Sequence, residues 1–212
     1  MRKLVTISRE YGSGGRIIGK LVAEKMGLPF YDREIIDMAV EKSGLSREII
    51  ETAELRAKSS ISYSFSSAMA FGENFTADPM PMNERLFLAQ FDVIRQIGQT
   101  DEGVIIGRCA DYVLRDMPGV TNIFIYAELE DRIERSVNQY GDDPEKVRQK
   151  IRDYDKARAN YYNYHTSQKW GAYENYNLMI NTSFISDDQA ANLIIDYLNT
   201  RTYRDPEETA DK

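Results

Sequence analysis

The residues best suited to chemistry lie in a glycine-rich turn that follows a short apolar segment. Residues 4–8 are mostly apolar, and Gly12-Ser13-Gly14-Gly15-Arg16 comes shortly after them. Glycine adopts positive φ and has no Cβ, so main-chain N–H groups of Gly12, Gly14 and Gly15 can face one centre. Residues 17–26 have a helical pattern, and a helix N-terminus favours negative charge. The turn therefore predicts an anion-binding loop, to which Arg16 adds a cation.

The turn only partly fits the nucleotide-binding pattern G-x-x-x-x-G-K-[ST]. In one register, Arg16 takes the place of the lysine and Ile17 that of the hydroxyl residue that holds Mg²⁺. Without gaps, the lysine position falls on Gly15 instead, and neither register supplies the Ser or Thr. A plain strand-to-helix turn of an α/β protein is the alternative interpretation.

Two further pairs of charged residues follow predicted strands. Asp32 and Arg33 come after the short strand 30–31, where a carboxylate would orient an acceptor and an arginine would neutralise phosphate. Asp32 as the N-cap of a helix over residues 34–42 is the alternative. Arg108 and Asp111 follow the strand 104–106, and they would bind an acceptor or form a surface salt bridge.

A cationic stretch follows Pro144 and is predicted to be helical. Arg148, Arg152, Lys156 and Arg158 recur near the spacing of one turn. They would either close over a migrating phosphoryl group as a lid or form a solvated face paired with local acids. His165, the single histidine, is expected to be structural rather than a catalytic base.

The elements that must position these residues alternate between strand and helix. Strands are expected at residues 4–8, 30–31, 104–106, 122–127 and 178–181. Ser186 and Gln189 form a capping box at the start of the last helix, and Gly98 is expected to end the helix that begins after Pro81. Such alternation predicts a parallel sheet covered by helices, with the ligand crevice at the carboxyl ends of the strands.

Composition limits the remaining classes of function. The chain has 212 residues, 42% of them hydrophobic, and a net charge of −7, which argues against a broad nucleic-acid footprint. Its single cysteine, Cys109, excludes an internal disulfide and a multi-cysteine zinc site. Neither a signal peptide nor a membrane span is recognisable, so a cytoplasmic protein is expected.

The glycine turn, together with Tyr31-Asp32, Gly107-Arg108 and Arg152 to Arg158, resembles the cytidylate kinase-like family of P-loop proteins over residues 4–198. The resemblance implies a three-layer α/β fold with a parallel sheet. Residues 1–200 would form one domain, with a helical acceptor-binding arm at about 43–98 and a lid at about 128–172. By composition, residues 201–212 are expected to be a polar tail, and residues 59–82, rich in Ser, Phe and Met, a mobile arm or a loop between helices.

The resemblance also implies ATP and Mg²⁺ as cofactors. The residues expected to hold ATP are Gly12, Ser13, Gly14, Gly15, Arg16 and Ile17. Arg16, Arg152 and Arg158 would stabilise the transferring phosphoryl group. The acceptor would contact Asp32, Arg33, Arg85, Arg108, Asp111 and Asp153. The Mg²⁺ ligands are not identified; Ser8, Ser13 or Asp32 acting through water are the alternatives.

The expected activity is transfer of the ATP γ-phosphoryl group to a nucleoside monophosphate, with CMP or dCMP preferred through the resemblance. The partners would be small-molecule nucleotides rather than nucleic acid or membrane. Two alternatives stay open. One is a kinase for another small-molecule acceptor, and the other is a nucleotide- or phosphate-binding protein that transfers nothing.

Overall fold

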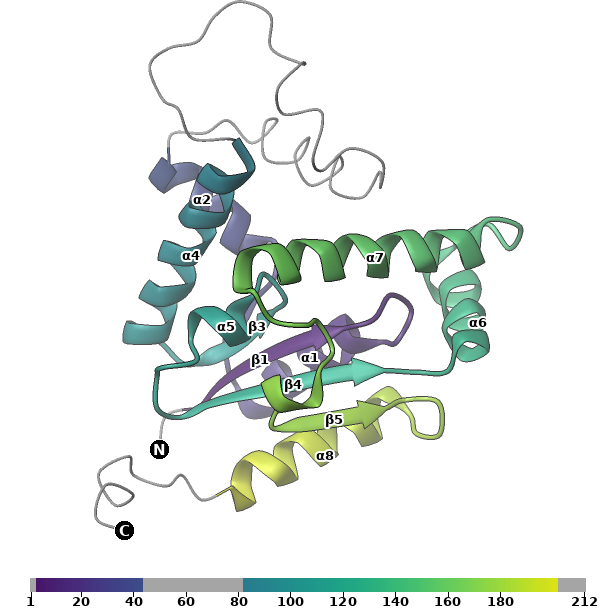
Figure 1. Ribbon diagram of the computed structural model, residues 1–212. Helices are drawn as coiled ribbons and strands as arrows, with labels where there is room; N and C mark the ends of the chain where they lie inside the picture. The colour runs from purple at the N-terminus through teal and green to yellow at the C-terminus, as the bar shows by residue number, and fades with distance from the viewer. Residues whose placement is uncertain (1–2, 44–81, 202–212) are drawn as a thin grey trace, which may run out of the picture.

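Five parallel strands and the helices between them make up the described part of the chain. The structure is a computed structural model that describes residues 3–43 and 82–201 (Figure 1). The strands are β1 Leu4–Arg9, β2 Phe30–Tyr31, β3 Gly103–Ile106, β4 Val120–Tyr126 and β5 Leu178–Asn181. The helices are α1 Gly15–Met26, α2 Glu34–Ser43, α4 Met82–Thr100, α5 Ala110–Val113, α6 Leu129–Tyr140, α7 Val147–Thr166 and α8 Asp187–Thr200, with a 3₁₀ turn at Tyr173–Asn175.

The sheet has the strand order β2-β3-β1-β4-β5, and β1 pairs with β3 on one side and β4 on the other. The register aligns Ile7 with Ile106 of β3 and with Ile123 of β4. The connection after β1 leads to β2 at one edge of the sheet, and the connection after β4 leads to β5 at the opposite edge. Open α/β sheets bind ligands at such a point, beyond the carboxyl ends of the central strands.

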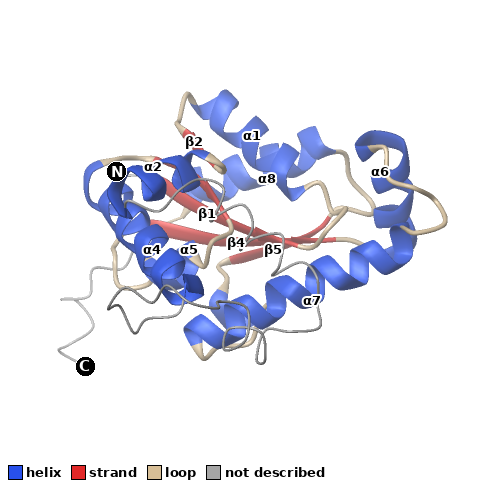
Figure 2. Ribbon diagram, turned by 90° about the horizontal axis from the view of Figure 1, so that it is seen from above, coloured by secondary structure: helices blue, strands red, loops and turns tan. Residues whose placement is uncertain are grey.

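Helices cover both faces of the sheet, as Figures 1 and 2 show. Val5 and Ile7 of β1 point to the face covered by α1 and α8, where they pack with Ile18 and Ile194. Leu4 points to the opposite face, in a core that α2, α4 and α5 contribute to. Both faces of β1 are buried, which explains why its sequence does not alternate strictly. The expected three-layer α/β fold is confirmed.

Most element boundaries follow the sequence pattern closely, including the capping box of α8. The Ser186 hydroxyl accepts a hydrogen bond from the Gln189 amide, and the Gln189 side chain accepts one from the Ser186 amide. The expectation that the helix after Pro81 ends at Gly98 is wrong, because this helix, α4, continues to Thr100. A Cβ at position 98 would collide with Leu114 and Met117, so this glycine permits close packing rather than a helix end.

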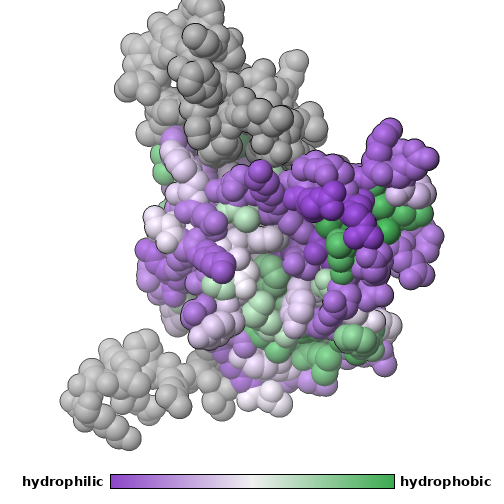
Figure 3. Space-filling model, turned by 45° about the vertical axis from the view of Figure 1, so that its right-hand side comes forward, coloured by the Kyte–Doolittle hydropathy of each residue, from purple (hydrophilic) through white to green (hydrophobic). Residues whose placement is uncertain are grey.

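Helix α7 runs back from α6 along the face of the sheet opposite α1 and α8 (Figures 1 and 2). Val147, Ile151 and Tyr162 form its buried side. Figure 3 shows hydrophilic side chains gathered over the upper part of the molecule, where α6 and α7 lie. The α6 and α7 helices occupy most of the expected lid range. The expected mobile segment 59–82 and the tail lie almost wholly outside the described residues.

Candidate active site

The loop between β1 and α1 has the conformation that only glycine adopts readily. Gly12 and Gly14 both have φ +81°. A Cβ on Gly12 would lie 2.7 Å from the main-chain oxygen of Arg132, so a larger residue would push α6 away. The loop glycines are buried, which means that α6 and its neighbours cover the loop in this conformation.

The N-terminus of α1 has amides suited to an anion. No side chain caps this helix, whose N-cap Gly14 has a left-handed conformation. Within residues 3–43 and 82–201, the amides of Gly12, Gly15 and Arg16 donate no hydrogen bond. Uncapped amides at the start of a helix favour negative charge through their orientation and through the helix dipole.

Other groups of the loop have partners within the chain. The Tyr11 amide donates to Asp155 at 2.7 Å, and the Ser13 amide donates to the Glu10 carbonyl at 3.4 Å. The Ser13 hydroxyl donates to the same Glu10 carbonyl at 2.9 Å. The Gly14 amide interacts with the phenol of Tyr140. Only some of the loop amides are therefore available to an anion in this conformation.

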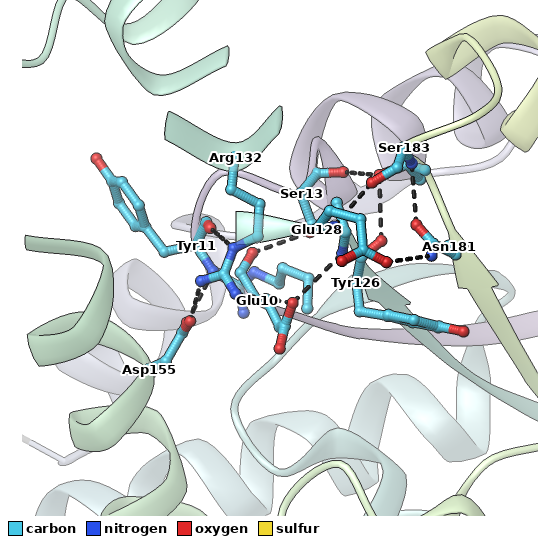
Figure 4. A network of polar contacts seen from close by, with 12 residues as sticks. Glu10, Tyr11, Ser13, Tyr126, Glu128, Arg132, Asp155, Asn181 and Ser183 are labelled. Carbon is cyan, nitrogen blue, oxygen red and sulfur yellow. Dashed lines mark hydrogen bonds and ion pairs between the residues drawn. The ribbon is translucent and has the colours of Figure 1, made fainter. Parts of the chain in front are cut away.

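Arg132 of α6 holds the loop against α7 (Figure 4). Its guanidinium donates to the Tyr11 carbonyl at 2.7 Å and to the Glu10 carboxylate at 2.9 Å, and it also binds Asp155. The Arg132 side chain is 8% exposed, so these contacts replace most of its hydration. Burial raises the pKa of Glu10, and the charge of Arg132 opposes that rise.

Arg16 and Asp32, both expected at the site, form an ion pair. The Arg16 Nε lies 2.6 Å from an oxygen of Asp32, which is buried while Arg16 is 60% exposed. Arg33 rather than Asp32 takes the N-cap position of α2, because the Arg33 carbonyl accepts from the Ile36 and Asp37 amides. The Arg33 side chain is exposed. Asp32 therefore positions the arginine of the loop.

The turn after β3 has a left-handed backbone at three successive residues, two of which are not glycine. Gly107, Arg108 and Cys109 have φ values of 66°, 61° and 54°. Left-handed conformations at residues other than glycine cost energy and cluster at functional sites. The turn directs Arg108 into a cavity of about 60 Å³. The cavity is lined by Ser8, Arg9, Gly107, Arg108, Cys109, Arg158, Tyr161, Tyr162 and Trp170.

Asp111 lies beside this cavity but does not line it. The carboxylate is 3% exposed and accepts a hydrogen bond of 2.7 Å from the Tyr162 hydroxyl. Burial raises its pKa to about 6, while the bond from Tyr162 opposes the rise. Asp111 thus joins α5 to α7 through Tyr162, which lines the cavity, and its contact with an acceptor stays a prediction.

Helix α7 separates the cationic residues that the sequence grouped together. Arg158 points inward, where it donates to the Arg9 carbonyl at 3.1 Å and lies 3.4 Å from Asp155. Arg152 is exposed and binds Gln149, which also binds Asp153. The expected lid residues therefore divide between the inner and outer sides of the helix.

Two other residues singled out in the sequence lie away from the cavity lining. Arg85 is half-buried on α4. His165 stacks on Phe87 with ring centroids 4.1 Å apart, and burial lowers its pKa. The stacking is consistent with the structural role expected for this histidine.

Sequence reasoning missed four charged residues at the loop: Arg9, Glu10, Arg132 and Asp155. Arg9 and Glu10 follow an apolar strand directly, and that position at the carboxyl edge of the sheet was the available signal. Arg132 and Asp155 become neighbours of the loop only through tertiary packing. Their local sequence is that of ordinary surface helices.

The described residues contain neither a metal-binding cluster of side chains nor a membrane-spanning helix. No group of three or more His, Cys, Asp or Glu side chains there is arranged to hold a metal ion. No helix in those same ranges is long and apolar enough to cross a membrane.

The parallel sheet, the glycine loop after β1 and the helices over both faces define a P-loop kinase-type fold. The sequence profile of the cytidylate kinase-like family matches residues 4–184, and the chain belongs to this family. Membership of a kinase-like family supports phosphotransferase activity for this protein. No curated protein matches the sequence.

Solved structures agree on the fold. A protein from Eubacterium ventriosum, described only as uncharacterized, is 24% identical over 94% of this chain and all of its own, with a TM-score of 0.69. Shikimate kinase from Acinetobacter baumannii, solved with shikimate, is 16% identical over 95% of this chain and 96% of its own, at a TM-score of 0.53. The shikimate kinase from Bacteroides thetaiotaomicron is 12% identical over 94% and 99%, at 0.55.

Proposed function

We propose that the protein transfers the γ-phosphoryl group of ATP to a small-molecule acceptor. The observation that carries this proposal is the uncapped start of α1 combined with arginines around one point. Besides burial, the positive charges of Arg16, Arg108 and Arg158, which come from three different segments, all lower the pKa of Arg9. Cations that converge on a glycine loop suit phosphoryl transfer, which depends on positioning and charge stabilisation.

Each group of residues has a role in this proposal. Residues 12–17 hold the ATP phosphates, and Arg108 with the cavity beside it receives the acceptor. Arg158 stabilises the transferring phosphoryl group from the inner side of α7. Because the loop glycines are buried under α6, α6 and α7 must move to admit ATP and then close to exclude water. Arg152 and Asp153 would contribute only if α7 also turned.

Mg²⁺ would bridge the ATP phosphates and neutralise charge during transfer. The Ser13 hydroxyl is directed to the Glu10 carbonyl, so Ser13 is poorly placed as a ligand. We assign Asp32 to this ion, through water, once Arg16 has turned toward the phosphates. We also propose that the protein acts in the cytoplasm and uses the ATP present there.

The acceptor is proposed as a nucleoside monophosphate, with CMP or dCMP first, because the family is cytidylate kinase-like. A different small acceptor is the main rival. The arginines recognise an anionic group, and the aromatic residues of the cavity, Tyr161, Tyr162 and Trp170, would stack on a base without distinguishing cytosine. Arg85 and Arg33 are assigned to acceptor binding only within the nucleotide version of the proposal.

A protein that binds nucleotide or phosphate without transfer is the second candidate. It is favoured by the departures from the nucleotide-binding pattern. Gly15 takes the lysine position in the register without gaps, and Ile17 takes the hydroxyl position in the other register. Poor placement of Mg²⁺ would weaken catalysis more than binding.

The experiment that tests the proposal is an ADP-release assay with Mg-ATP and a panel of acceptors. The panel contains CMP, dCMP, UMP, AMP and small hydroxyl acids. ADP formation that depends on one acceptor supports the kinase and identifies the acceptor. Calorimetry with ATP, with and without Mg²⁺, supplies the second readout. Magnesium-independent binding without turnover would favour the binding protein, and absence of ATP binding would reject both candidates.

A further inference from the structure

Two departures from the nucleotide-binding pattern lie next to each other in the structure. In the register without gaps, Arg9 stands at the first glycine of the pattern and Gly15 stands at the lysine. A Cβ added to Gly15 would lie 2.5 Å from the Cβ of Arg9. A side chain at position 15 and the arginine at position 9 therefore exclude each other in this conformation.

The Arg9 side chain extends from the loop to the turn after β3. Its guanidinium occupies the space that a Cβ on Gly107 would need, and Arg9 lines the cavity with Arg108 and Arg158. Both Gly15 and Gly107 thus leave room for the same arginine. The side chain spans the interval between the start of α1 and the proposed acceptor cavity.

The surroundings of Arg9 leave its charge poorly compensated. Burial lowers the pKa of Arg9 to about 9, and nearby Arg158, Arg108 and Arg16 act in the same direction. Asp32 is the carboxylate that opposes them, and it already binds Arg16 at 2.6 Å. A half-buried cation with cationic neighbours gains from an anion within hydrogen-bonding reach.

Arg16 differs from Arg9 in both exposure and pairing. Its side chain is 60% exposed and lies against Asp32, which is 11% exposed. Arg16 must give up this ion pair to reach a phosphate, whereas Arg9 has no carboxylate at hydrogen-bonding distance among the residues that the structure describes.

We propose that Arg9 supplies the phosphate-binding charge that a lysine at position 15 would supply, reaching the same phosphates from the end of β1. This inference rests on the proposed function, since it assigns a residue to the phosphate site of that activity. It goes beyond that function by moving the principal cation from the helix to the strand.

Isothermal calorimetry with ATP and with inorganic pyrophosphate tests the proposal. Arg9→Ala is expected to lower both affinities at least tenfold, and Arg9→Lys to lose less. Arg16→Ala should have a smaller effect than Arg9→Ala. Arg115→Ala removes a cation on the surface beside Tyr112, far along the chain from the loop, and serves as the matched control.

A double variant tests the exchange of positions directly. Arg9→Gly combined with Gly15→Lys restores the pattern, and it should bind pyrophosphate more tightly than Arg9→Gly alone. Circular dichroism melting establishes that each variant is folded. If Arg9→Ala does not fold, Arg9→Lys and the double variant still decide the question through their pyrophosphate affinities.

The outcomes separate this inference from the proposed function. Wild-type protein that binds ATP while Arg9→Ala binds it equally well overturns the role of Arg9 and leaves the kinase proposal standing. A double variant no better than Arg9→Gly also counts against the exchange. Wild-type protein that binds neither ATP nor pyrophosphate overturns both.

Discussion

The carboxylate of Asp155 accepts a 2.7 Å hydrogen bond from the main-chain amide of Tyr11, across 144 positions of sequence. Asp155 also binds Arg132 and lies 3.4 Å from Arg158. A carboxylate oxygen resembles a phosphate oxygen in charge and in its capacity to accept hydrogen bonds. In this conformation, the chain's own carboxylate therefore occupies part of the electropositive surroundings of the loop.

Replacing Asp155 by Asn should raise the affinity for pyrophosphate several-fold. The amide oxygen still accepts from Tyr11, but the negative charge that competes with phosphate is gone. Calorimetry at low and high salt measures the effect, which should shrink at high salt as charges are screened. Asp196→Asn, an exposed change on α8, is the control for net charge. A weaker affinity in Asp155→Asn would mean that the carboxylate instead holds Arg158 in its binding position.

Removing Arg132 should destabilise the fold strongly. Its side chain is 8% exposed and satisfies Glu10, Asp155 and the Tyr11 carbonyl. Deleting one partner of a buried ion pair leaves uncompensated charge, at a cost of about 3 kcal/mol in the free energy of unfolding. Urea denaturation of Arg132→Ala measures this loss.

The control for Arg132 lies on the neighbouring helix. Arg148 binds Glu130 at 2.7 Å, but both side chains are well exposed, at 47% and 73%. Solvent screens such a pair, so Arg148→Ala should cost less than about 1 kcal/mol. Equal losses in the free energy of unfolding of the two variants would contradict the role of Arg132 in holding the loop.

Asp111 should make the fold less stable as pH rises. Burial raises its pKa in the folded protein to about 6, above its ordinary value of 3.8, so the folded state binds the proton more tightly. Its contribution to stability is full at pH below about 4 and is lost as pH rises to about 6. Compared with wild type, Asp111→Asn should gain on the order of 2 kcal/mol between pH 4 and pH 7.

A neighbouring hydroxyl provides the check on this pH dependence. Tyr162 donates to Asp111, and this bond lowers the pKa of the carboxyl. Tyr162→Phe should therefore extend the loss of stability to higher pH. Urea denaturation over a pH series measures all three proteins. A difference between wild type and Asp111→Asn that does not vary with pH would show that Asp111 titrates normally.

The strands and the order of helices could be predicted from the sequence, because strands that are buried on both faces consist of consecutive apolar residues. Val104, Ile105 and Ile106 are all fully buried in β3, and the sequence run predicts this. The Ser186 cap of α8 is equally local, because its signal lies within four residues. Fold class therefore follows from patterns that short segments carry.

The candidate site depends on contacts that no short segment records. Arg152 and Arg158 look equivalent in sequence, yet one binds Gln149 on the exposed side of α7 and the other reaches the Arg9 carbonyl. The role of Arg9 becomes visible only when Gly15 and Gly107 are seen on either side of it. Such roles follow from packing between distant segments.

Gly98 misled the sequence interpretation for a related reason, and it provides the last prediction. Alanine is a better helix former than glycine by about 1 kcal/mol, so Gly98→Ala would stabilise α4 on propensity alone. The added Cβ would lie 2.7 Å from the Met117 sulfur and even closer to Leu114. Overpacking of a core costs about 1–3 kcal/mol, so a net loss of stability is expected. The adjacent exposed Gln99→Ala has no such contact and should be neutral or slightly stabilising in urea denaturation. A gain in Gly98→Ala equal to that in Gln99→Ala would mean that the contact of α4 with Leu114 and Met117 is looser than the structure describes.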